Sequence, residues 1–133
     1  MTTEKKLGYD LNTRIKVKKL KQAIELLNIG WCRGHDAVDE HGNSIGPRST
    51  KAVGWCAVGS IYAAAHKPSF HYDYFHPIVS DVAETIKKSY PKFTKTSADD
   101  SEVIFNFNDE PEVQFEQVIE CFEKTIERLK DNA

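Results

Sequence analysis

An apolar periodicity near the C-terminus constrains the fold of this 133-residue chain most strongly. Six apolar residues recur there at helical spacing: Phe115, Val118, Ile119, Phe122, Ile126 and Leu129. Such spacing places them on one face of an α-helix, and that face must be buried against other elements. Asp109 precedes Glu112 by three positions, with Pro111 between them, a pattern typical of a helix N-terminus. We therefore predict a final amphipathic helix with Asp109 as its N-cap.

Three further helices are predicted upstream. Residues 12–28 carry an inward apolar stripe and are followed by Gly30, which is typical of a helix end. Residues 49–66 are apolar on almost every side, which indicates a central helix. Residues 77–90 begin with a proline, place apolar residues at helical spacing and stop before Pro91.

These elements predict a mainly α fold, a small single-domain bundle of about four helices. Residues 103–107 alternate like a short strand but also fit one helical turn, so an α+β fold with a strand there is the alternative. Residues 1–11 are expected to form a flexible N-terminal arm, and residues 12–133 the single helical domain. A chain of this length suffices for one core.

Charge and cysteine usage restrict the class of protein. A net charge of -2 argues against nucleic-acid binding by the whole protein. No apolar run is long enough to cross a bilayer, so no membrane association is expected. Three cysteines form an odd set, and residues 1–6 are too polar for a secretory signal. We therefore expect a cytoplasmic protein.

The final helix carries a stripe of carboxylates opposite its apolar face: Glu112, Glu116, Glu120, Glu123, Glu127 and Asp131. Like charges at these spacings repel one another, so cationic groups should lie nearby. Residues 1–21 hold seven basic and two acidic side chains. We predict that Lys16, Lys18, Lys19 and Lys21 pair with the stripe and make the first and last helices neighbours. The alternative is that Glu116 and Glu120 bind a basic patch on a protein partner.

A repeated Trp-Cys pair offers candidate chemistry, at residues 31–32 and again at residues 55–56. Cys56 near the start of a helix would have a lowered thiol pKa and could act as a nucleophile. Its candidate partners are His35, His71 or His76 as the base and Asn108 or Asp109 as the orienting group. The competing interpretation is that Cys56 is a small buried hydrophobe and that Asp109 only caps a helix.

Metal binding has weaker support. Cys32 and His35, with two residues between them, supply half of a zinc site to which Cys56 could contribute, but no second close ligand pair follows. We predict neither a bound metal nor a cofactor.

Residues 66–76 combine histidines and aromatic side chains on an irregular segment. Five of them form the predicted partner-binding surface: Phe70, His71, Tyr72, Tyr74 and Phe75. Aromatic residues on loops often anchor binding surfaces.

Several short motifs resemble an uncharacterised bacterial and phage family, domain-of-unknown-function family 6197. The motifs are residues 20–27 leading into Gly-Trp-Cys-Arg-Gly at 30–34, Asp39, Gly42, residues 55–60 and Phe-Asn-Asp at 107–109. The similarity spans about residues 20–129. This family has no assigned activity, so the resemblance implies a fold and a cytoplasmic or phage-encoded origin, and no reaction.

We expect a non-enzymatic binding or regulatory protein of bacterial or phage type that acts through a protein partner. One alternative is a cysteine-dependent hydrolase or transferase using Cys56. Another is a small-molecule or nucleotide binder that uses a pocket between the glycine-rich loop (residues 31–49) and the aromatic segment (residues 66–76).

Overall fold

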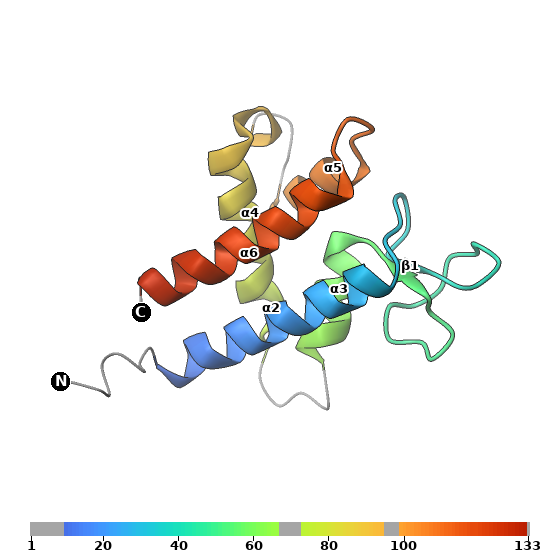
Figure 1. The fold of residues 1–133 in the computed structure, drawn as a ribbon, viewed down its shortest axis with the longest axis horizontal. Coiled ribbons are helices and arrows are strands. Elements are labelled where there is room, and N and C mark those ends of the chain that lie inside the picture. The colour runs from blue at the N-terminus through green and yellow to red at the C-terminus, as the bar shows by residue number, and fades with distance from the viewer. Residues whose placement is uncertain (1–9, 67–72, 95–98, 133) are drawn as a thin grey trace.

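A computed structural model describes residues 10–66, 73–94 and 99–132 (Figure 1). The helices and strands within these ranges are α2 (Leu11–Ile29), β1 (Ala37–Val38), β2 (Gly54–Trp55), α3 (Ala57–Ala65), α4 (Phe75–Ser89), the 3-10 turn η1 (Pro91–Thr94), α5 (Asp100–Asp109) and α6 (Phe115–Asp131). The mainly α prediction is therefore confirmed. The described part of the chain contains five α-helices, one more than the four expected.

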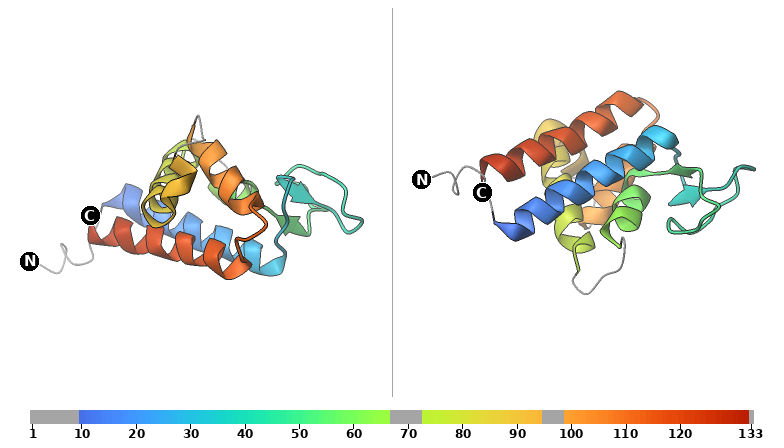
Figure 2. Two further views of the ribbon diagram at one scale, coloured as in Figure 1. Left: turned by 90° about the horizontal axis from the view of Figure 1, so that it is seen from above. Right: turned by 60° about the horizontal axis from the view of Figure 1, so that its bottom comes forward.

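The helices form two layers. Helices α2 and α6 lie side by side and run in opposite directions, and α3, α4 and α5 pack across them (Figures 1 and 2). The two layers bury apolar residues from every helix, of which Phe107 and Phe122 are the largest fully buried side chains. The prediction that the first and last helices are neighbours is thus confirmed.

The apolar stripes point inward as their spacing predicted. On α2 the buried residues are Val17, Leu20, Ala23 and Leu27. On α4 they include Ile78, Val82 and Ile86. Helix α2 begins at Leu11, one residue before the start predicted at residue 12. Asp10 is its N-cap, and its side chain accepts a hydrogen bond from the Thr13 amide at 2.8 Å.

The predicted helix over residues 49–66 is wrong in its first half. Strand β2 replaces it there and pairs antiparallel with β1, Ala37 opposite Trp55. The Trp55 amide also donates to the carbonyl of Gly30 at 2.9 Å, so the backbone of this segment is bonded to neighbouring segments. Helix α3 therefore starts at Ala57, with Cys56 as its N-cap.

Residues 103–107 form part of α5, so the alternative strand at this position is wrong. Asp99 caps this helix, and its side chain accepts from the Glu102 amide at 2.9 Å. The apparent alternation arises because Val103, Ile104 and Phe107 are buried on one helical face while Phe105 is half-buried.

Asp109 is not the N-cap of the final helix. It ends α5, and α6 begins six residues later at Phe115. The Gln114 amide donates to the side chain of Gln117 at 2.7 Å, which satisfies a backbone donor at the true start of α6. Of the helices in the described residues, none combines the length and hydrophobicity needed to cross a membrane.

Candidate functional site

The side chain of Asn108 attaches the loop after α2 to helix α5. It is completely buried, and its Oδ1 accepts hydrogen bonds from Trp31 Nε1 at 2.8 Å and from the Ala57 amide at 3.0 Å. Its Nδ2 donates to the Cys32 carbonyl at 3.1 Å and to Asp109 Oδ1 at 2.9 Å. An asparagine side chain has two donors and two acceptor lone pairs, so all of its hydrogen-bonding capacity is used. Asn108 is therefore a structural joint.

Arg33 extends this joint to the connection between α5 and α6. Its Nε donates to the Asn108 carbonyl at 3.2 Å, and its Nη2 donates to the carbonyls of Glu110 and Val113. The guanidinium also lies 4.6 Å from the centre of the Trp31 ring. These bonds hold residues 110–113 in a turn and explain why α6 does not begin at Asp109.

The thiol of Cys56 is buried at the N-terminus of α3. Its Sγ accepts a hydrogen bond from the Gly59 amide at 3.3 Å, and the residue is 1% exposed. Burial raises the pKa of this thiol to about 12, outweighing the hydrogen bond that lowers it. The expectation that the helix terminus lowers the pKa is therefore wrong, and Cys56 is protonated at neutral pH.

The remaining predicted catalytic residues, Asn108, Asp109 and His35, contact the segments next to Cys56 in different ways. Asn108 is bonded to the first amide of α3, and Asp109 Oδ1 accepts from the Gly34 amide at 3.0 Å. His35 is exposed, and its carbonyl accepts from the Cys32 thiol at 3.5 Å. Burial, with Asp109 and Asp36 adding to it, raises the pKa of Cys32 to about 11.

The other two candidate bases are not part of this cluster. His76 Nδ1 lies 2.7 Å from Asp73 Oδ2 at the start of α4, and His71 lies outside the described residues. Across the described ranges, no group of three or more His, Cys, Asp or Glu side chains is arranged to hold a metal ion.

A cavity of about 450 Å³ opens where the glycine-rich loop meets α3, α4 and α5. Its lining residues are Asp36, Pro47, Val58, Gly59, Tyr62, Phe75, Ser101 and Phe105. The rings of Tyr62 and Phe75 meet edge to face, with their centres 5.3 Å apart. Among these lining residues only Phe75 belongs to the predicted partner-binding surface. Tyr62 and Phe105 were not predicted, because Tyr62 lies in an apolar helical run and Phe105 in the alternating segment 103–107, where both resemble core positions.

Gly59 lines this cavity and lies in close contact with the backbone of the loop. A Cβ atom built on Gly59 would lie 1.9 Å from the carbonyl oxygen of Asp36, so only glycine lets the loop approach α3 so closely. The same Asp36 carbonyl accepts from the Cys56 amide at 3.1 Å. The Asp36 carboxylate is exposed and makes no hydrogen bond or ion pair with any residue the structure describes.

Of the other predicted partner-binding residues, those that the structure describes do not line the cavity. Tyr74 donates to Asn12 at 3.3 Å and lies beneath Lys19, whose Nζ is 5.7 Å from the ring centre. Phe70, His71 and Tyr72 fall outside the described residues. Glu116 and Glu120 are exposed on α6.

Lysines of α2 were predicted to pair with the carboxylate stripe of α6. This prediction is wrong for Lys16 and Glu120, whose ion pairs are with other residues. Lys16 Nζ lies 2.9 Å from Asp81 on α4, and Glu120 lies 4.0 Å from Lys124 on its own helix. Lys19 Nζ donates to the Ala64 carbonyl at 3.3 Å. The two helices are held together by apolar contact rather than by these charges.

Fold and site together define a small, mainly helical domain in which a buried asparagine holds a glycine-rich loop against an aromatic cavity. The chain belongs to the family of unknown function DUF6197, whose family model matches residues 16–128. No curated protein and no solved structure matches the chain.

Proposed function

We propose that this is a non-enzymatic binding protein that acts through a protein partner and takes a basic side chain of that partner into the aromatic cavity. The observation that carries the proposal is the composition of the cavity wall. Three aromatic rings, from Tyr62, Phe75 and Phe105, share a space of about 450 Å³ with the carboxylate-bearing Asp36.

The residues that line the cavity suit the side chain of arginine or lysine, which has a cationic group at the end of an apolar methylene stem. A guanidinium or ammonium group is attracted to an aromatic face within about 6 Å of the ring centre. The Asp36 carboxylate, which has no described partner, supplies the opposite charge. Val58 and Pro47 offer apolar surface for the methylene stem. Arginine fits best because its planar group both stacks on rings and forms two parallel bonds to a carboxylate.

The thiols favour a binding role over a cysteine-dependent enzyme. A nucleophilic cysteine needs a lowered pKa, whereas burial raises the pKa of Cys56 to about 12. All three cysteines are free, which suits the reducing cytoplasm that we propose as its location, in a bacterium or a phage-infected cell.

Site-specific photo-crosslinking tests the proposal. A photoreactive phenylalanine analogue at position 62 should capture a partner protein in host lysate, and the same analogue at exposed Ser80 on α4 is the control. We expect Asp36→Asn to reduce capture from position 62 at least about tenfold, the value of one charged hydrogen bond. Equal capture with and without Asp36→Asn would contradict the proposal.

A small organic cation is the second candidate occupant, because the cavity volume falls within the range of small-molecule sites. Native mass spectrometry of the purified protein distinguishes the two occupants. A bound small molecule, lost in Asp36→Asn and absent from any crosslink, would favour this candidate.

A further inference from the structure

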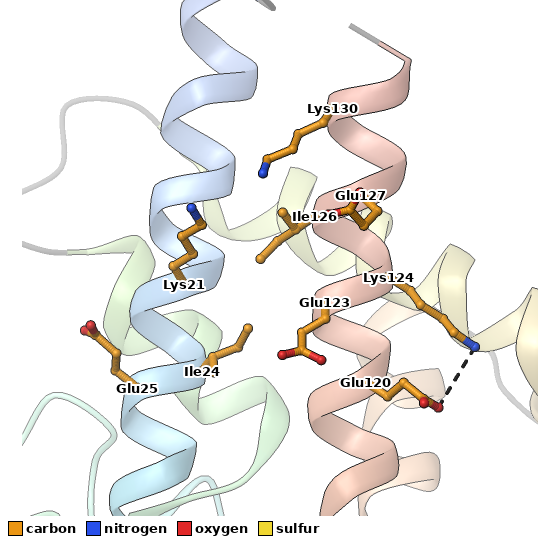
Figure 3. Close-up of a pocket in the computed structure, with 9 residues that line it drawn as sticks. All are labelled: Lys21, Ile24, Glu25, Glu120, Glu123, Lys124, Ile126, Glu127 and Lys130. Atoms are coloured by element: carbon orange, nitrogen blue, oxygen red, sulfur yellow. Dashed lines mark ion pairs between the residues drawn. The ribbon is translucent and has the colours of Figure 1, made fainter.

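A groove of about 660 Å³ runs between α2 and α6 on the face opposite α3, α4 and α5 (Figure 3). Ile24 from α2 and Ile126 from α6 form its apolar floor. The two helices are antiparallel, and the groove is lined by residues 21–25 of α2 and residues 120–130 of α6 (Figure 1).

Charge is distributed unequally along this groove. Glu127 lies near Lys130 at one end, and Glu120 and Lys124 form an ion pair at the other, which leaves the first end net basic and the second net acidic (Figure 3). The charges that set this polarity are Lys21 and Lys130 toward the first end and Glu25 and Glu123 toward the second. None of these four charged side chains forms an ion pair with a described residue. A surface with a basic end, an apolar centre and an acidic end is complementary to a reversed copy of itself.

We propose that the groove is a homodimer interface, in which a second copy of this chain docks its own α2–α6 face. Two copies facing each other are related by a two-fold axis in the contact plane. With the axis perpendicular to the helices, the basic end of each copy covers the acidic end of the other. With the axis parallel to the helices, the basic ends of the two copies would face each other, so Lys21 of one copy and Lys130 of the other would repel. Charge therefore selects the perpendicular axis.

The size of the face indicates a weak dimer. Helix α2 has 19 residues and α6 has 17, so each is about 25–28 Å long. Two such helices at ordinary packing distance present roughly 500 Å² per copy. Roughly 1,000 Å² in total lies at the lower end for specific interfaces, so we expect a dissociation constant on the order of micromolar.

Sedimentation velocity over a concentration series tests the proposal by charge reversal. The wild-type protein should change from monomer to dimer at about 1–100 µM, and added salt should weaken the dimer because its charge pairs are exposed. The double variant Lys21→Glu with Lys130→Glu should be monomeric, and so should Glu25→Lys with Glu123→Lys. Mixing the two double variants should yield a heterodimer, and combining all four substitutions in one chain should restore the homodimer.

A control variant carries the same change in net charge outside the groove, Lys51→Glu with Lys88→Glu. It should dimerise like the wild type, and its mixture with Glu25→Lys, Glu123→Lys should not form a heterodimer. Circular dichroism melting confirms that every variant is folded. A wild-type protein that stays monomeric to about 100 µM, or a dimer insensitive to the groove reversals, would overturn the proposal.

Discussion

The side-chain oxygen of Asn108 accepts a hydrogen bond from the backbone amide of Ala57 at 3.0 Å, across 51 positions of the chain. This bond joins the end of α5 to the start of α3. The first amides of a helix have no partner within the helix, so Asn108 acts as a cap supplied from a distant element. The same oxygen accepts a hydrogen bond from the indole N–H of Trp31. This bond fixes the start of the glycine-rich loop, which lies on one side of the cavity.

Removal of the Asn108 side chain is therefore expected to destabilise the whole domain. Asn108→Ala leaves the Ala57 amide and the Trp31 indole without their acceptor and should cost about 3 kcal/mol in the free energy of unfolding. Urea denaturation measures this change. The matched control Asn28→Ala, at an exposed position on α2, should change the free energy by less than about 0.5 kcal/mol. Equal effects of the two substitutions would refute the role of Asn108 as a joint.

Gly59→Ala should be strongly destabilising because the new Cβ would lie 1.9 Å from the Asp36 carbonyl oxygen. The loop or α3 must move to relieve this contact, at an expected cost of about 2 kcal/mol or more. Gly46→Ala is the control, since a Cβ there meets nothing within 4 Å. Thermal unfolding of both variants measures the difference. A Gly59→Ala protein as stable as Gly46→Ala would show that the close approach is unimportant.

Asp109→Ala should loosen the loop after α2 without affecting the start of α6. The substitution removes the acceptor for the Gly34 amide and for the Nδ2 group of Asn108, and should cost about 1–2 kcal/mol. Hydrogen exchange resolved by residue should speed up at Gly34 and stay unchanged at the Gln114 amide. The variant Gln117→Ala should give the opposite pattern, because Gln117 accepts from Gln114. Faster exchange at Gln114 in Asp109→Ala would return Asp109 to the predicted capping role.

The buried thiol of Cys56 should make stability fall at alkaline pH. The pKa of this thiol is 9.0 in its ordinary state and about 12 in the folded protein, so the unfolded chain loses this proton first as the pH rises. The stability that protonated Cys56 contributes is present below about pH 9 and decreases toward pH 12. The difference in unfolding free energy between wild type and Cys56→Ala should therefore shrink between about pH 9 and about pH 12.

Native thiol labelling provides an independent check on the same group. A bulky reagent should modify Cys56 only after urea is added, because the residue is 1% exposed. Rapid modification in the native state, or a pH-independent stability difference, would restore the nucleophile hypothesis.

The helices were predictable from sequence where one face of a long segment is buried. The periodic residues of α6 and the proline near the start of α4 marked both elements, although α6 begins at Phe115 and not near Asp109. That boundary depends on Arg33, which binds the carbonyls after α5 from nearly eighty positions away. Local pattern contains no information about such a contact.

The site was predictable only in part for the same reason. The burial of Cys56 was predictable because its neighbours in the sequence are apolar. The aromatic-rich segment pointed to Phe75, which lines the cavity, but its role in binding a partner stays a prediction. The contribution of Asp36 depends on the contact of its backbone with Gly59, 23 positions later. Neither residue has a distinctive neighbourhood in the sequence, so the cavity emerges only from the fold.

A titration followed by residue-resolved NMR tests the central claim, recognition of a basic side chain in the aromatic cavity, most directly. The probes are N-acetyl-arginine amide and its neutral isostere N-acetyl-citrulline amide. We predict that the arginine derivative shifts the amide signals of Gly59 and Ser101 at concentrations on the order of millimolar, and that citrulline or the Asp36→Asn variant abolishes the shifts. Equal shifts with both probes, or shifts confined to residues outside the cavity, would contradict the account.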